Sequence, residues 1–184
     1  MTRRIVGFKI IRNKKKPGVE VTHEHQYVDH SGAIVPVTTP SQFHQVIPHQ
    51  DLIALWDRLS IHYAAITERE EHDDSTIANE GEIERCATEY PVSSIQWKDG
   101  KNYTGIMFHG HKVLSTGASC NALTRLVKFS DETEPYELAD QLQELSDAIR
   151  AEVEALLNGK HAKPAQTNLT DPDQAIPEEE EQEA

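Results

Sequence analysis

One order of patterns occurs twice along this chain: three strand-like segments followed by one helix-like segment. In the first half, the strand-like segments are rich in β-branched or alternating residues and lie at 5–11, 19–27 and 33–38. A helical face comes next, with apolar residues at steps of 4, 3, 4 and 3: Leu52, Trp56, Leu59, Tyr63 and Ile66. The first half therefore predicts a β-β-β-α unit over residues 1–66.

The second half predicts the same kind of unit over residues 91–160. Its strand patterns lie at 92–97, 103–114 and 122–129. A helix is expected to begin near Pro135 and to end at Asn158-Gly159. Its apolar residues recur at steps of 4, 3, 4, 4 and 3: Leu138, Leu142, Leu145, Ile149, Val153 and Leu156. The two halves share order and pattern rather than letters, and they predict an internal duplication of layout.

A single unit of three strands and one helix buries too little apolar surface to be stable alone. We therefore expect an α+β protein in which the two units join edge to edge. The result is a six-stranded, mostly antiparallel sheet with both helices on one face. The opposite face, called the open face below, is left for solvent, for a second subunit in a homo-oligomer, or for a ligand.

Charge is spread unevenly along the chain, whose net charge is −13. Residues 67–90 carry 2 basic and 9 acidic side chains, and residues 161–184 carry 1 and 7. The first segment is expected to be an acidic, partly ordered linker between the units. The second is expected to be a disordered acidic tail, because it has few apolar residues to offset its ordering entropy. The body without these segments is close to neutral, so a phosphate-binding surface remains compatible with the composition.

Several classes of protein are excluded by the sequence. No apolar run approaches the ~18 residues that a membrane span needs, so no membrane association is expected. Lys9 and Arg12 interrupt the N-terminal apolar stretch, which argues against a signal peptide. Cys86 and Cys120 cannot form a disulfide framework, and they indicate a reducing compartment. A cytoplasmic location is therefore expected.

Three short motifs carry a resemblance to a known group of proteins. They are Val6-Gly7-Phe8-Lys9-Ile10, Pro48-His49-Gln50-Asp51-Leu52 and Leu157-Asn158-Gly159-Lys160-His161-Ala162. The second resembles a Pro-His-Pro-Asp helix start found in small uncharacterised proteins of tailed bacteriophages, with Gln50 where proline is usual. The resemblance implies a phage or prophage setting, and hence a host-cell cytoplasm, but no particular activity.

Two His-x-His motifs are the sharpest candidate for chemistry: His23-Glu24-His25 and His109-Gly110-His111. Alternate residues of a strand point to one side, so each motif directs two imidazoles to the same face. If the duplication brings the pairs together, they form a site for zinc or another transition metal. Such a site would make the protein a metal-dependent hydrolase that uses a metal-activated water. The alternative is that the histidines are polar, half-exposed and unrelated.

A basic N-terminal hairpin is the second candidate. Its cations are Arg3, Arg4, Lys9, Arg12, Lys14, Lys15 and Lys16. Lysine and arginine on an exposed hairpin are suited to phosphate groups. Three aromatic side chains would stack on bases if they share the open face: Tyr27, Trp97 and Tyr103. The competing interpretation is a solvated turn whose lysines protect an edge strand from aggregation.

These observations favour a non-enzymatic accessory protein that binds single-stranded nucleic acid or a nucleotide on its open face. No cofactor is expected, except the metal of the alternative hydrolase. No glycine-rich phosphate loop follows a strand, which argues against nucleotide hydrolysis of the familiar kinds. A third hypothesis is an inhibitor that binds a protein partner through its acidic linker and tail.

Overall fold

The computed structural model describes residues 3–12, 15–68, 77–100, 103–130 and 135–161. The strands of the first half are β1 (Arg3–Ile11), β2 (Gly18–Val28), β3 (Ile34–Thr38) and β4 (Gln42–His44). Two helices follow, α1 (Gln50–Glu68) and α3 (Glu80–Glu89). The second half contains β5 (Val92–Asp99), β6 (Thr104–Val113), β7 (Ser119–Leu123), β8 (Val127–Lys128) and α4 (Ala139–Leu157).

The strands form one curled antiparallel sheet in the order β3-β2-β1-β5-β6-β7. β3 pairs with the C-terminal part of β2, and β4 pairs with its N-terminal part. Likewise, β7 pairs with the C-terminal part of β6, and β8 pairs with its N-terminal part. Each half is thus a central hairpin whose second strand carries two short partners. The predicted α+β fold class, with two similar units joined edge to edge, is confirmed.

The third strand of each unit is divided in two, which the sequence patterns did not indicate. In the first half, Pro40 lies between β3 and β4 and has no backbone N–H to donate. In the second half, the Thr124 hydroxyl accepts the backbone N–H of Phe108 at 2.9 Å, where a strand carbonyl would otherwise bond. Both interruptions let the third segment turn along the sheet edge.

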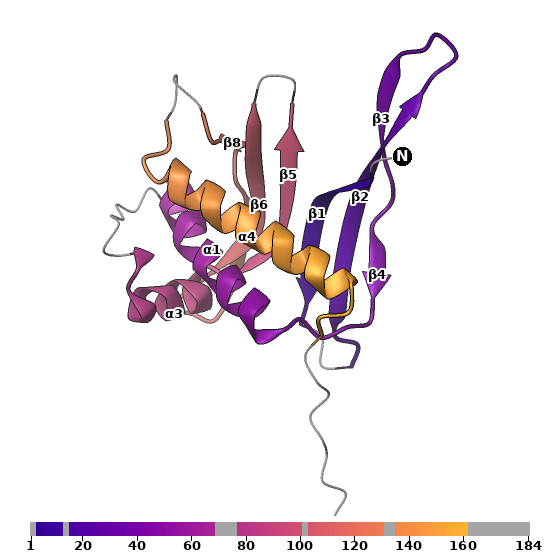
Figure 1. Cartoon of the computed structure of the whole chain (residues 1–184). Coiled ribbons are helices and arrows are strands. Elements are labelled where there is room, and N and C mark those ends of the chain that lie inside the picture. Colours follow the sequence, from indigo (N-terminus) through magenta and orange to yellow (C-terminus); the bar gives the residue numbers. More distant parts are fainter. Residues whose placement is uncertain (1–2, 13–14, 69–76, 101–102, 131–134, 162–184) are drawn as a thin grey trace, which may run out of the picture.

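α1 and α4 cover one face of the sheet, and the core lies between them and the strands (Figure 1). Phe8 of β1 meets Trp56 of α1 edge to face, with ring centroids 5.4 Å apart. The Trp56 indole also donates to the Val92 carbonyl at 2.9 Å, which ties the first unit's helix to the second unit's first strand. The helices therefore bind the two units into one body.

The acidic segment 67–90 contains a helix, α3, that packs against α1. The Asn79 side chain caps its N-terminus by accepting the Gly81 and Glu82 backbone N–H groups. Cys86 on its inner side is completely buried in the core. This part of the expected linker is therefore ordered, while residues 69–76 lie outside the described residues.

The ends of the chain differ in part from expectation. α4 begins at Ala139, four positions after Pro135, and its N-cap Leu138 forms no side-chain cap hydrogen bond. The helix ends as predicted, with Gly159 at a positive φ of 104°. The expected disorder of the tail falls on residues 162–184, which lie outside the described residues. Among the helices that the structure describes, none has both the length and the apolar content needed to cross a membrane.

Candidate functional site

The predicted cations of the N-terminal hairpin do not form one surface. Lys9 lies on the open face and pairs with Glu20 at 3.3 Å, whereas Arg12 pairs with Asp57 of α1 at 3.0 Å. Arg3 donates to the buried His23 Nδ1 at 3.0 Å, and the Lys16 ammonium lies 4.9 Å from the centroid of the Phe43 ring. The exposed Lys15 neighbours Lys16 in the turn, and Lys14 lies outside the described residues.

The three candidate aromatic side chains also separate. Trp97 is only 3% exposed, and its indole N–H donates to the Ser146 hydroxyl of α4 at 2.8 Å. The condition that it share the open face with Tyr27 and Tyr103 is therefore not met, because the register of β5 turns its side chain toward the helices. Tyr27 is exposed in the part of β2 that pairs with β3, a ribbon that projects beyond the sheet body (Figure 1). Tyr103 remains accessible, at 37% exposure, beside the end of β5.

The two His-x-His motifs do not converge. His23 and His25 lie on β2 and His109 and His111 on β6, with β1 and β5 between the two strands. His23 is also buried opposite Ile5 on the helix-covered side, whereas His109 pairs with Ser94. The expected four-imidazole site is therefore not assembled. Within the described ranges, no group of three or more His, Cys, Asp or Glu side chains is arranged to hold a metal.

His23 has a perturbed environment of its own. Burial lowers its pKa below the ordinary value, and the charges of Arg3, His25 and His44 lower it further. The neutral imidazole accepts the hydrogen bond from Arg3, which a protonated ring could not do at Nδ1. Its Nδ1 is therefore engaged by Arg3 within the first unit.

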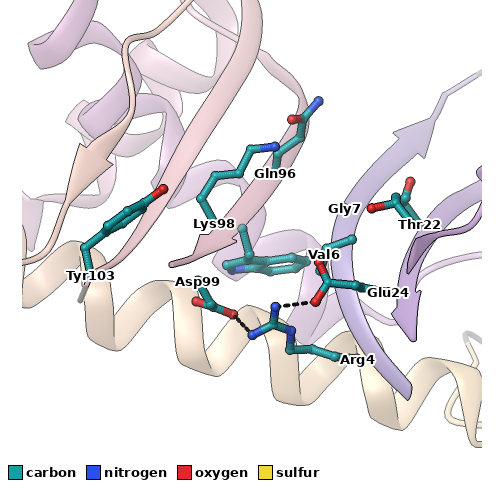
Figure 2. Close-up of a pocket in the computed structure, with 11 residues that line it drawn as sticks. Arg4, Val6, Gly7, Thr22, Glu24, Gln96, Lys98, Asp99 and Tyr103 are labelled. Atoms are coloured by element: carbon teal, nitrogen blue, oxygen red, sulfur yellow. Dashed lines mark hydrogen bonds and ion pairs between the residues drawn. The ribbon is translucent and has the colours of Figure 1, made fainter. Parts of the chain in front are cut away.

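A polar pocket lies at the seam between the two units, where β1 and β5 separate (Figure 2). These strands pair only from Gly7 opposite Gln96 to Lys9 opposite Ser94. Beyond Gly7 the backbones diverge and leave a cavity of about 260 Å³, which we call the seam pocket. Its lining residues are Arg4, Val6, Gly7, Thr22, Glu24, Thr38, Gln96, Trp97, Lys98, Asp99 and Tyr103. Three predicted binding residues, Arg4, Trp97 and Tyr103, therefore meet here.

Arg4 spans the seam pocket from one unit to the other. Its Nη1 lies 2.9 Å from Asp99 Oδ2, and its Nη2 lies 2.6 Å from Glu24 Oε1 (Figure 2). Asp99 also meets Arg150 of α4 at 3.5 Å, and the Arg150 guanidinium lies 4.9 Å from the centroid of the Trp97 ring. The charge of Arg4 is thus balanced by two carboxylates, which fix its position and reduce its attraction for an anion.

Lys98 and Tyr103 line the pocket on the side of β5 and the turn that follows it. Lys98 is exposed and forms no ion pair with any residue that the structure describes. The Lys128 ammonium lies 5.8 Å from the centroid of the Tyr103 ring. Gly100 allows Tyr103 to pack closely, since a Cβ at this position would collide with the ring. The Gly100 N–H also donates to the Tyr103 carbonyl at 2.8 Å, which closes the turn.

Taken together, the seam pocket offers an aromatic face, a cation without an ion pair, two carboxylates, and the hydroxyls of Thr22 and Thr38. A small polar ligand with both an anionic group and hydrogen-bond donors would be chemically complementary to such a set. Sequence patterns did not single out Glu24, Gln96, Lys98 or Asp99 for this role. These side chains come together only because of the way β1 and β5 pair, and no local sequence motif encodes that pairing.

No family model, no curated protein and no solved structure matches this chain.

Proposed function

We propose that the protein is a non-enzymatic binding protein that holds a phosphate-bearing ligand of nucleotide size in the seam pocket. The observation that carries the proposal is the wall formed by Lys98 and Tyr103 beside the Arg4–Glu24–Asp99 cluster. A cation without a carboxylate partner is the appropriate contact for a phosphate. An exposed aromatic ring next to it is the appropriate contact for a base.

The charges within the pocket assign different parts of the ligand to different walls. Lys98 is the proposed phosphate contact, with Lys128 nearby at the Tyr103 ring. Arg4 is not proposed as a phosphate contact, because Glu24 and Asp99 already compensate its charge. Glu24 and Asp99 would instead accept hydrogen bonds from an amino or hydroxyl group of the ligand. A ligand with both kinds of group fits better than a bare phosphate ion.

The size of the pocket favours a nucleotide over a nucleic-acid strand. A cavity of about 260 Å³ lies just below the range of ligand pockets, about 300–1,000 Å³, and leaves no room for several nucleotides. A nucleic-acid strand would need a continuous basic track and accessible aromatic rings. Lys9 and Arg12 are instead paired with carboxylates, and Trp97 is in the core. These features support the nucleotide among the ligands expected from the sequence.

Calorimetric titration of the full chain tests the proposal. The panel contains nucleoside mono- and diphosphates, a cyclic nucleotide, inorganic phosphate and a single-stranded oligonucleotide. Removing a charge-assisted hydrogen bond costs about 1.5–3 kcal/mol, so Lys98→Ala should weaken nucleotide binding by about 10–100-fold. Tyr103→Leu should also weaken it, because base stacking on an aromatic ring contributes about 1–3 kcal/mol.

Arg125→Ala is the matched control, since Arg125 is an exposed cation that does not line the pocket. It should leave nucleotide binding unchanged. Absence of binding to every member of the panel at low salt would overturn the proposal. Oligonucleotide binding that both pocket variants leave intact would overturn it as well, because the binding surface would then lie elsewhere.

A further inference from the structure

A second hollow, which we call the end groove, lies at the end of the molecule where β1 passes into β2. Its volume is about 690 Å³. Apolar side chains line it, from β1, from the turn after β1, from the segment before α1 and from α1 itself: Ile10, Ile11, Pro17, Ile47, Pro48 and Ile53. Ile47 is 50% exposed, which leaves an apolar contact area open to solvent. Exposed apolar area of this kind marks an interaction surface when polar groups surround it.

Polar side chains line the edge of the end groove: Arg12, His49, Gln50 and His161. Arg12 pairs with Asp57 and His49 lies 3.1 Å from Asp51, so the basic character of this edge comes mainly from the turn before Pro17. Lys15 and Lys16 directly precede Pro17 of the groove, and both are exposed. The first turn of α1 also begins here, and it already carries Asp51, as a helix N-terminus favours negative charge. The groove therefore suits a segment that combines apolar anchors with acidic side chains.

The chain's own C-terminal segment starts at this groove. The Lys160 ammonium lies 3.0 Å from Asp51 Oδ2 of α1 and 2.7 Å from Glu152 Oε2 of α4. This pair of contacts holds the end of α4 against the start of α1 and places His161 in the lining of the groove. The three motifs noted in the sequence, 6–10, 48–52 and 157–162, contribute Ile10, Pro48, His49, Gln50 and His161 to this one location.

Residues 162–184 have the composition that the groove requires. They contain seven acidic side chains and one basic one, and their larger apolar residues are Leu169 and Ile176. Because residue 161 already lines the groove, the segment is tethered there without any intervening linker. A short tether raises the effective concentration of a segment to the millimolar range, so even weak contacts suffice for occupancy.

We propose that the end groove is a binding site for an acidic peptide segment with apolar anchors, and that its occupant is residues 162–184 of the same chain. The acidic side chains lie over Lys15 and Lys16, and an apolar anchor covers Ile47. The basic turn is thereby withheld from other anions. This inference concerns a different surface from the seam pocket, and it holds whether or not a nucleotide binds there.

Paramagnetic relaxation in the full chain tests this inference. A nitroxide is attached at Ala175→Cys, next to the anchor Ile176, in a Cys120→Ser background, where the buried Cys86 is not modified. We expect selective loss of amide signal intensity at Ile47 and Ile53, and none at Leu123 on β7. The effect should weaken as salt is raised from 0.1 M to 1 M, because the Debye length falls from about 10 Å to about 3 Å. Equal intensities at all three amides in low salt would overturn the proposal.

Charge reversal separates the groove from general electrostatic attraction. The double variant Lys15→Glu and Lys16→Glu should abolish the selective loss. The matched control is Lys98→Glu with Arg125→Glu, which makes the same change in net charge at exposed cations outside the groove lining, and it should preserve the loss. Mixing isotope-labelled chain with unlabelled, nitroxide-carrying chain tests for a second copy. Loss in that mixture equal to the loss within one chain would overturn the intramolecular occupant.

Discussion

Arg4 and Asp99 meet across the gap at which the backbones of β1 and β5 part, with Nη1 2.9 Å from Oδ2. Backbone pairing joins these strands at only three residue pairs, ending at Gly7 and Gln96. The ion pair therefore joins the two units through side chains at a point where the strands no longer pair through their backbones. It also forms one wall of the seam pocket.

The Arg4–Asp99 contact should contribute to stability by a modest, measurable amount. In a double-mutant cycle of Arg4→Ala and Asp99→Ala, we expect a coupling free energy of about 0.5–1 kcal/mol, since Arg4 is 38% exposed on its side chain. Urea denaturation of the four proteins measures it. The pair Lys9→Ala and Glu20→Ala, more exposed and within one unit, is the comparison and should give less. Additive effects of Arg4→Ala and Asp99→Ala would contradict this role.

His23 should make the protein less stable in mild acid. Its pKa is lowered in the folded state by burial, so the folded protein keeps it neutral while the unfolded chain takes up a proton below about pH 6.5. The stability contributed by neutral His23 is present above pH 6.5 and is lost as the pH falls from there toward the folded pKa. Melting temperatures between pH 7.5 and 5 measure this slope.

His23→Gln should flatten that part of the pH profile, because glutamine does not titrate and its carbonyl oxygen can accept the Arg3 hydrogen bond. His109→Gln, on the other unit, is the control and should keep the slope of the unchanged protein. A slope that His23→Gln leaves unaltered would show that other groups cause the acid sensitivity.

Ser146→Ala should destabilise the fold more than its small size suggests. The substitution leaves the buried Trp97 indole N–H without its acceptor, which costs about 1–3 kcal/mol. Chemical denaturation measures the loss. Ser115→Ala, in the exposed turn after β6, is the matched control and should change stability little. If Trp97→Phe removes the effect of Ser146→Ala, the unsatisfied N–H is its cause; an equal loss in both backgrounds would exclude that cause.

Lys160 should control the titration of Asp51. A hydrogen bond from the Lys160 ammonium is the main cause that lowers the pKa of Asp51, with a further contribution from His49. Lys160→Gln is therefore expected to move the Asp51 pKa upward, toward its ordinary value. An NMR titration of the carboxyl carbon measures the change, with Lys128→Gln as the control. An unchanged pKa in Lys160→Gln would mean that the ends of α1 and α4 are not joined in solution as described.

The overall architecture followed from sequence because each half carries its own periodic signal. The helical face from Leu52 to Ile66 and the alternation along 19–27 specify elements without reference to the rest of the chain. α3 escaped notice because its apolar residues are few, and burial of Cys86 against α1 is a tertiary contact. The division of the third strands depends on where Pro40 and Thr124 fall relative to their partner strands.

The candidate site was predictable only in part. Arg4, Trp97 and Tyr103 were singled out as separate basic and aromatic residues, and they do meet at one pocket. Their roles could not be assigned, because these depend on the register between β1 and β5 and on which carboxylates arrive beside each cation. Glu24 and Asp99 neutralise Arg4, whereas Lys98 has no such neighbour among the described residues.

The short pairing between β1 and β5 has a consequence for how this architecture can vary. Because only three residue pairs connect the two units within the sheet, a few side chains at the strand ends set the size of the opening between β1 and β5. Substitutions of lining residues that lie outside the core, such as Gln96 and Lys98, can therefore change the opening while the packing beneath α1 and α4 is left intact.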